Sequence, residues 1–239
     1  EKAKELEVEE DDIEMVFRIF PNPQRALSTM AKTDTRSIQE RPCFLCEKNR
    51  PAEQTSLPFG HYEICLNPYP IFQRHLTIID KEHTSQSIKG RFEDMLHLAE
   101  NMIDFYILYN GPECGASAPD HMHFQAGNRG FMPIEEDIHN AKTEVVVNAG
   151  KGELCLVKGL AQSCFLIRTT DVEAGAVLFG QLYAALNIPE GEIEPMLNVL
   201  CWFEKETWYL VVFPRKQHRP TCYFAEGDAN ILISPASVD

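Results

Sequence analysis

The order of hydrophobic and polar residues predicts a run of β-strands interrupted by one helix in the first half of the chain. Residues 60–67 alternate between polar and apolar, and His75–Asp80 is rich in β-branched residues, so both segments are predicted strands. Apolar residues then recur at helical spacing from Ser87 to Tyr106, which predicts an amphipathic helix. A strand-like stretch over Phe105–Tyr109, a loop that contains glycine and a second strand over His121–Gln125 follow.

The same order of elements returns in the second half of the chain. Residues 132–148 form a polar segment, after which Cys164–Arg168 is a predicted strand. Asp171 is placed to cap the helix that follows it, and Met196–Phe203 and Trp208–Phe213 are predicted to form a hairpin. Strand, helix, strand, strand thus occurs twice. This repetition indicates either an internal duplication that kept its chemistry in the first copy or a chance succession of α and β elements.

These patterns divide the chain into three predicted parts. Residues 1–40 contain a charged start and a short helix over Ile13–Phe20, where apolar residues recur at helical spacing. Residues 41–142 form the half with candidate chemistry, and residues 143–239 form a second, degenerate half. The expected fold class is α+β, with an antiparallel sheet and a packed helix in each half.

Composition and charge narrow the class of partner. The chain of 239 residues carries a net charge of −14, which argues against a nucleic-acid partner because phosphate backbones attract basic surfaces. No apolar run approaches the roughly 20 residues that span a bilayer, so no membrane partner is expected. Of the eight cysteines, only Cys43 and Cys46 lie close together in the sequence, and the other six are scattered. This usage favours a reduced, cytoplasmic protein over a disulfide framework.

Residues 120–125, with the sequence DHMHFQ, carry the candidate chemistry. In an extended segment His121, His123 and Gln125 share one face, and the two apolar residues between them point the other way. The preceding loop, residues 109–117, is rich in residues that let backbone N–H groups approach an anion. Two imidazoles and an amide beside such a loop suit attack on phosphorus, because histidine can act as the nucleophile and fixed donors stabilise the developing charge. An ordinary surface pair or a partial metal site is the alternative.

Cys43 and Cys46 form a Cys-x-x-Cys motif that is followed by polar residues and Pro51. This spacing is typical of half a zinc site or of a redox pair, and it also occurs in plain packing. A redox pair usually opens a helix after a strand, whereas the polar residues here indicate a knuckle-like turn. Zinc is therefore favoured over a redox role, and plain packing stays open as an alternative.

A dense basic cluster, Arg215-Lys216-Gln217-His218-Arg219, follows the last predicted strand. In a chain with a net charge of −14 such a cluster can attract a phosphate group. Arg215 and Arg219 are the candidate phosphate ligands. An ordinary solvated loop is the alternative.

Together these stretches resemble the histidine-triad superfamily. Residues 72–86 resemble the superfamily strand that ends in a histidine, and the helix, the Asn110-Gly111 loop and the His-x-His strand follow in the same order. Gln125 replaces the third histidine of the triad. This form is similar to the transferase branch, which contains galactose-1-phosphate uridylyltransferase, diadenosine tetraphosphate phosphorylase and GDP-hexose phosphorylases. The resemblance covers roughly residues 40–220 and implies two histidine-triad-like halves.

The resemblance also implies roles for individual residues. His123 would attack the α-phosphorus of a nucleotide, His121 would support it or bind metal, and Gln125 would hydrogen-bond the phosphoryl oxygens. Ser117 lies one place before the usual position of a superfamily serine, which is Ala118 here. A structural zinc ion would be held by Cys43, Cys46, His83 and His121. The residues implied at the substrate are Asn67, Asn110, Gly111, Ser117, Arg215 and Arg219.

The predicted function is nucleotidyl transfer by a nucleotidyltransferase or phosphorylase that works through a nucleotidyl-histidine intermediate. The substrate would be a nucleoside diphosphate sugar or a dinucleoside polyphosphate, and the acceptor would be inorganic phosphate or a sugar phosphate. Because an amide cannot act as an acid or base, Gln125 favours transfer over hydrolysis. A histidine-triad nucleotide hydrolase and a zinc-stabilised nucleotide-binding module without turnover are the alternatives. A homodimer is compatible with the resemblance, because this superfamily often dimerises.

Overall fold

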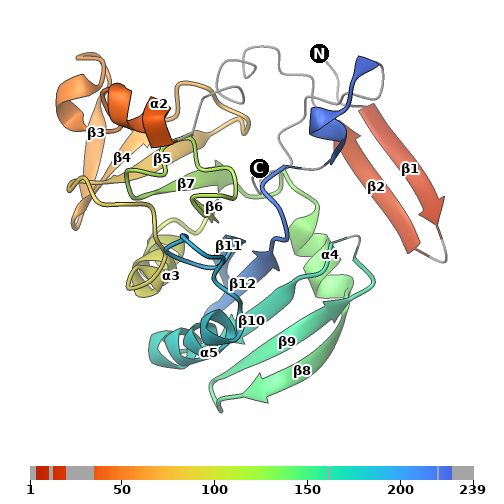
Figure 1. Ribbon diagram of the computed structural model, residues 1–239. Helices are drawn as coiled ribbons and strands as arrows, with labels where there is room; N and C mark the ends of the chain where they lie inside the picture. Colours follow the sequence, from red (N-terminus) through yellow and green to blue (C-terminus); the bar gives the residue numbers. More distant parts are fainter. Residues whose placement is uncertain (1–3, 11–12, 20–34, 161, 220, 228–239) are drawn as a thin grey trace.

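The computed structural model describes residues 4–10, 13–19, 35–160, 162–219 and 221–227, and Figure 1 shows how their elements are arranged. These residues form one two-stranded sheet and one ten-stranded sheet. The strands of the larger sheet are β3 (Ser56–Phe59), β4 (Tyr62–Leu66), β5 (His75–Asp80), β6 (Phe105–Asn110), β7 (His123–Asn128), β8 (Lys142–Asn148), β9 (Gly152–Lys158), β10 (Phe165–Thr169), β11 (Leu197–Glu204) and β12 (Thr207–Pro214). The helices are α2 (Thr35–Glu40), α3 (Phe92–Asn101), α4 (Ile134–Asn140) and α5 (Val172–Ala185), with short 3-10 turns η2 (Glu47–Asn49) and η3 (Thr221–Phe224).

The N-terminal residues form a hairpin instead of the predicted helix. Strand β1 (Lys4–Glu10) pairs antiparallel with strand β2 (Ile13–Ile19) along its whole length. The prediction of a helix is therefore wrong for residues 13–19, whereas Phe20 lies outside the described residues. Apolar residues in this stretch also alternate with a period of two, and the charged segment before it supplies the strand with which they pair.

The ten-stranded sheet is built from two sets of five strands. Its order is β3-β4-β5-β7-β6-β11-β12-β10-β9-β8, and every neighbouring pair is antiparallel. Each strand of the first set has a counterpart five places later in the chain, and the two sets meet at β6 and β11. Helix α3 connects β5 to β6, and α5 connects the counterparts β10 and β11. The predicted α+β class, with an antiparallel sheet and a packed helix in each half, is confirmed.

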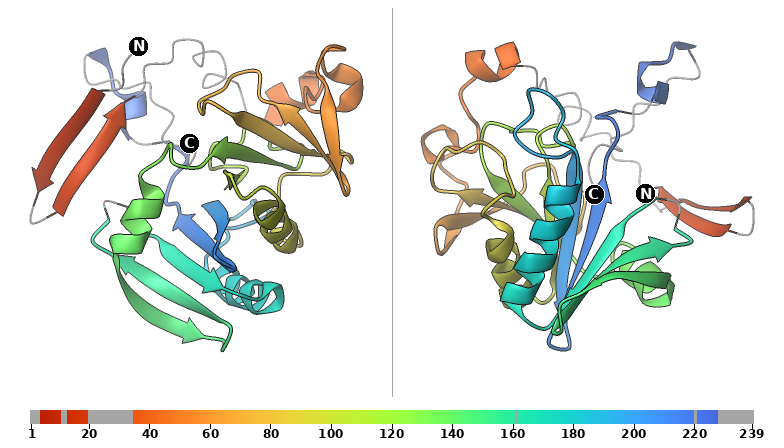
Figure 2. Two further views of the ribbon diagram at one scale, coloured as in Figure 1. Left: turned by 180° about the vertical axis from the view of Figure 1, so that it is seen from behind. Right: turned by 60° about the horizontal axis from the view of Figure 1, so that its bottom comes forward.

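Helices α3 and α5 pack on the same face of the sheet, as the right view of Figure 2 shows. The rings of Phe92 and Phe179 stack with centroids 4.2 Å apart, and Trp208 Nε1 donates to the carbonyl of Leu96 at 2.9 Å. Helix α3 is shorter than the predicted helix over Ser87–Tyr106. It begins only after Gly90, whose φ of 77° is incompatible with continuing the helix. The larger core cluster therefore lies between the two helices and the central strands.

The opposite face of the sheet is covered by α4, whose Ile138 packs in a second core cluster with Trp202 and Tyr106. Helix α4 and strand β8 both lie in the segment that was predicted only as polar. Strand β8 is at the edge of the sheet and most of its residues are exposed, so its hydrophobic pattern is weak. Within the described part of the chain no helix is long and apolar enough to span a membrane.

Candidate active site and metal centre

His123 is the first residue of β7, and its imidazole is held in one tautomer. Its Nδ1 lies 2.8 Å from the backbone carbonyl of His121. A carbonyl can only accept, so Nδ1 carries the hydrogen and Nε2 presents a lone pair. Burial lowers the pKa of His123 to about 4, and the hydrogen bond to the His121 carbonyl opposes that shift. The ring is therefore neutral near pH 7 and has a free nitrogen for nucleophilic attack.

Gln125 lies two residues further along β7, and its side chain is oriented by His75 on β5. His75 Nδ1 accepts a hydrogen bond from the backbone N–H of Ile71 at 3.1 Å. Its Nε2 then carries the ring hydrogen and donates to Oε1 of Gln125 at 2.9 Å. The carbonyl end of the Gln125 amide is thereby occupied, and its NH₂ end is the one left to donate elsewhere. Sequence analysis overlooked this role of His75, although strand alternation places it on the same face as its neighbour Thr77.

Asn110 and Asn198 extend the site across the junction between the two halves. They lie directly opposite each other on β6 and β11, and both are buried. Asn198 Nδ2 donates to Oδ1 of Asn110 and to the carbonyl of Cys114, each at 2.7 Å. Its own Oδ1 accepts from Arg215 at 2.9 Å. Sequence analysis did not single out Asn198 as a site residue, because its position depends on the pairing of two strands far apart in the chain.

The loop after β6 is packed closely against the second half. The N–H of Gly111 donates to the carbonyl of Leu197 at 3.1 Å. A Cβ at Gly111 would lie 2.8 Å from that same oxygen, so only glycine fits there. Ser117 lies later in this loop, and its carbonyl accepts from Arg41 at 3.4 Å. Gly111 thus lies between the two halves, where it allows close packing and its N–H is already bonded, whereas Ser117 contacts Arg41 of the first half.

Asn67 stands at the turn that leads into β5. Its Nδ2 donates to Oγ1 of Thr77 at 3.1 Å, and its Oδ1 accepts from the backbone N–H of Tyr69 at 2.9 Å. Thr77 is opposite Gln125 in the β5–β7 pair. Asn67 therefore lies one strand away from Gln125 and supports the strand that carries His75.

The basic cluster contacts the site at two points. Arg215 binds Asn198, and His218 Nδ1 lies 3.1 Å from a carboxylate oxygen of Glu113 in the loop after β6. Arg219 is partly buried, whereas Lys216 is exposed. The cluster thus sits against the loop that precedes the histidine strand.

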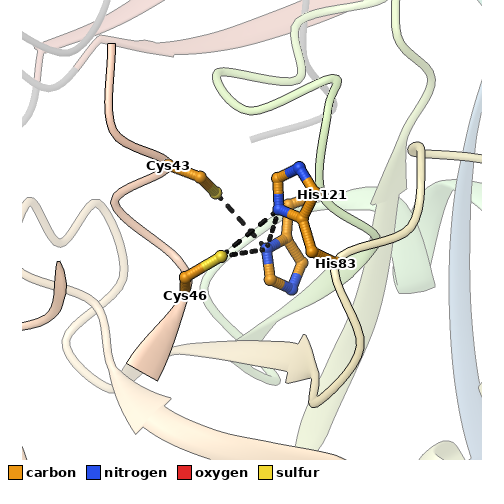
Figure 3. A group of neighbouring side chains, drawn as sticks. All are labelled: Cys43, Cys46, His83 and His121. Carbon is orange, nitrogen blue, oxygen red and sulfur yellow. Dashed lines mark hydrogen bonds between the residues drawn. The ribbon is translucent and has the colours of Figure 1, made fainter. Parts of the chain in front are cut away.

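Four predicted metal ligands converge at one place, as Figure 3 shows. Cys43 Sγ lies 3.3 Å from His121 Nδ1, and Cys46 Sγ lies 3.3 Å from His83 Nδ1 and 3.6 Å from His121 Nδ1. The two Nδ1 atoms are 3.2 Å apart, and all four donor atoms lie within 4.8 Å of one another. Tetrahedral zinc with bonds of about 2.0–2.3 Å would place neighbouring donors roughly 3.3–3.8 Å apart. These residues could therefore hold a metal ion of that kind.

The surroundings of the cluster match those of a metal ligand set. His121 Nε2 lies 2.8 Å from the carbonyl of Asp80, to which it donates, so Nδ1 presents its lone pair to the cluster. Burial and the neighbouring thiol of Cys43 raise the pKa of Cys46. Asp120 lies beside the cluster in an ion pair with Arg41 at 2.8 Å. Both ring nitrogens of His121 are engaged, so His121 contacts His123 through its backbone carbonyl and not through its imidazole ring.

The fold and this strand resemble those of the histidine-triad class. Two five-stranded halves meet at β6 and β11, and the first carries a His-x-His-x-Gln strand beside an Asn-Gly loop. More particularly, the chain belongs to the family described as Domain of unknown function (DUF4922), which matches residues 1–128.

Solved structures with a similar fold include yeast Ap4A phosphorylase Apa2 in complex with AMP. That structure has a TM-score of 0.55 and 17% sequence identity, with 90% of this chain and 72% of the yeast chain covered. A DUF4931 family protein from Bacillus cereus has a TM-score of 0.47 and 16% identity, covering 70% of this chain and 88% of the other. No curated protein matches in sequence. The likeness to the yeast phosphorylase is a likeness of fold.

Proposed function

We propose that this protein is a nucleotidyltransferase that forms a covalent nucleotidyl-histidine at His123. The observation that carries the proposal is the 2.8 Å contact between His123 Nδ1 and the His121 carbonyl. It leaves Nε2 as an unprotonated nucleophile on a ring that burial keeps neutral. A nucleophile of this kind needs no additional base to remove a proton before it attacks.

In the first step, Nε2 of His123 forms a bond to the α-phosphorus of a bound nucleotide. The bond between that phosphorus and its bridging oxygen breaks, and the leaving group departs with the electron pair. This group is a sugar phosphate from a nucleoside diphosphate sugar, or a nucleoside polyphosphate from a dinucleoside polyphosphate. In the second step an oxygen of the acceptor phosphate attacks the same phosphorus and releases neutral His123. Gln125 supports both steps, because its NH₂ end can donate to a phosphoryl oxygen while His75 holds the other end.

Transfer to a phosphate-bearing acceptor is favoured over hydrolysis. The amide of Gln125 cannot take a proton from water, so activation of water at that position is missing. An acceptor phosphate already carries a negatively charged oxygen and needs no such base. The acceptor is therefore inorganic phosphate or a sugar phosphate.

The proposed substrate is a nucleoside diphosphate sugar or a dinucleoside polyphosphate. Strands β7, β6, β11 and β12 are consecutive in the sheet, so Arg215 follows a strand roughly 14 Å from the His123 strand. Its guanidinium is turned toward Asn198, one strand nearer. This spacing suits a ligand with two or more linked phosphates. The yeast phosphorylase of similar fold was solved with AMP, which supports a nucleotide ligand.

The cluster of Cys43, Cys46, His83 and His121 is the proposed structural zinc site. A zinc ion held by these residues would supply rigidity, because it would connect the segment before β3 to the two loops that flank β5 and β7. His121 then offers its carbonyl to His123 from a fixed position. The seven cysteines whose side chains are described are free thiols, which suits the reducing conditions of a cytoplasm.

Labelling with ³²P at the α-phosphorus tests the proposal. The protein is incubated with GDP-glucose, UDP-glucose or diadenosine tetraphosphate in the absence of acceptor, and acid-labile label on the protein is measured. We expect label on the protein with at least one of these substrates, and its release as a nucleoside diphosphate when inorganic phosphate is added. Release to water at the same rate with and without phosphate identifies a hydrolase. Binding without label or product identifies a module without turnover and overturns the proposal.

A further inference from the structure

Gln86 is a fully buried residue in the segment that follows β5. Among the described residues, its side chain bonds only to backbone groups of the site. Its Nε2 donates to the carbonyl of Asn110 at 2.9 Å and to the carbonyl of His123 at 3.0 Å. Its Oε1 accepts from the N–H of His123 at 2.8 Å. Both amide hydrogens and the oxygen are thus used, and both backbone polar groups of His123 are bound by one side chain.

The position of this amide coincides with the end of the β6–β7 pairing. The pairs run from Phe105 opposite Asn128 to Leu108 opposite Gln125. The same register continued by two residues would place Asn110 opposite His123. The Gln86 amide joins these two residues instead. A side-chain amide has the same donor and acceptor types as a peptide group, so it can replace a rung of the ladder and leave no buried group unsatisfied.

The backbone around Gln86 is anchored to the residues before β7. Gln86 N–H donates to the carbonyl of Pro119 at 3.0 Å, and the carbonyl of Thr84 accepts from Met122 N–H at 2.7 Å. The amide is therefore presented from a fixed segment, and the backbone position of His123 relative to Asn110 depends on it.

We propose that Gln86 is a positioning residue that holds the ends of β6 and β7 apart, so that a phosphoryl group can be accommodated at His123. This inference rests on the proposed function, in which that group is transferred to His123. A Gln86 side chain that only fills buried space would affect folding but not the rate of the chemical step in folded protein. Measuring the rate of the chemical step in folded protein therefore distinguishes the two roles.

The test compares Gln86→Met, which keeps the size of the side chain and removes its hydrogen bonds, with the control Gln54→Met. Gln54 also donates from its amide to a backbone carbonyl, that of Leu66 at 3.0 Å, but it is partly exposed and its amide is not bonded to His123 or Asn110. In single-turnover labelling, Gln86→Met should attach label about 10- to 100-fold more slowly. Nucleotide affinity should stay within about threefold, and the control should keep the wild-type rate. A full labelling rate in folded Gln86→Met overturns the proposal.

If Gln86→Met does not fold, Gln86→Glu takes its place. It keeps the oxygen that accepts from His123 N–H and replaces the two donors with an oxygen that faces two carbonyls. Its labelling rate should fall in the same way, and an unchanged rate in this variant contradicts the proposal.

A second readout does not depend on turnover. Hydrogen exchange of the His123 backbone amide should become about 10-fold faster in the Gln86 variant than in the control. If the wild-type protein takes no label, the proposed transfer fails, and this exchange measurement still decides whether Gln86 holds His123. If the His123 amide exchanges at the same rate in the Gln86 variant and in the control, Gln86 does not have the positioning role.

Discussion

His75 donates from Nε2 to the side-chain oxygen of Gln125 at 2.9 Å, across the paired strands β5 and β7. The direction of this hydrogen bond is set by Ile71, whose backbone N–H occupies the other ring nitrogen. Gln125 therefore has one defined amide orientation, with the NH₂ end available to a phosphoryl oxygen. The amide that replaces the third triad histidine is thus held by a further histidine on the neighbouring strand.

Replacing His75 by Phe should slow formation of the covalent intermediate. The ring is retained, but the Gln125 amide loses its partner and can rotate. The loss of one hydrogen bond worth about 1 kcal/mol corresponds to a rate reduction of roughly fivefold. Single-turnover labelling measures it, with nucleotide affinity as the control. A wild-type rate in this variant would mean that the orientation of Gln125 is set by something else.

His123→Ala should abolish both turnover and the acid-labile adduct, while nucleotide still binds. The reason is that Nε2 of His123 is the proposed nucleophile, whereas both ring nitrogens of the neighbouring His121 are engaged. His123→Gly gives a more specific test of the nucleophile, because added imidazole or a nucleoside phosphorimidazolide can replace the missing ring and restore the reaction. Retention of the full rate in His123→Ala would falsify the covalent mechanism.

Gln125→His should raise the share of product that goes to water. A histidine at this position can take part in proton transfer, which an amide cannot do. The measurement is the ratio of nucleoside monophosphate to phosphorolysis product at fixed phosphate concentration, compared with the wild-type protein. An unchanged ratio would show that the identity of residue 125 does not decide between transfer and hydrolysis.

Protein purified without added metal should contain about one zinc per chain by elemental analysis, because a four-ligand site of this type binds tightly. Cys46→Ser should lose most of the metal and lower the thermal midpoint. Cys65→Ala is the matched control, since Cys65 is a buried thiol outside the cluster. A zinc content below about 0.2 per chain in wild-type protein counts against the site.

Changing Arg215 and Arg219 together to Ala should weaken nucleotide binding. Hydrogen bonds that involve a charged group are each worth roughly 1.5–3 kcal/mol, so a loss of at least about tenfold in affinity is expected. Lys216→Ala serves as the control, because Lys216 is exposed in the same cluster. Equal affinities of the double variant and the control would identify the cluster as a solvated loop. Titration calorimetry at constant ionic strength provides the comparison, since screening by salt affects all three residues.

Local patterns in the sequence were sufficient where an element is specified by neighbouring residues. His75–Asp80 was predicted as a strand and is β5 with the same bounds. Asp171 was predicted to cap a helix, and its side chain accepts from Ala174 N–H at 3.0 Å. The spacing of His123 and Gln125 likewise places both on one strand, because alternation along a strand needs only local order.

Tertiary structure decided the features that depend on strand pairing and on position in the sheet. The apolar residues of segment 13–19 fit both the helical period and the strand period. The segment forms a strand because it pairs with the preceding segment, which had been described only as charged. Local patterns in the sequence do not show which groups the side chains of Gln86, Asn198 and His75 contact. Their roles arise because the register of β5, β6, β7 and β11 brings distant backbone and side-chain groups together. The sequence alone thus predicted the candidate reacting residues, whereas the groups that orient them follow from long-range pairing, which local patterns do not encode.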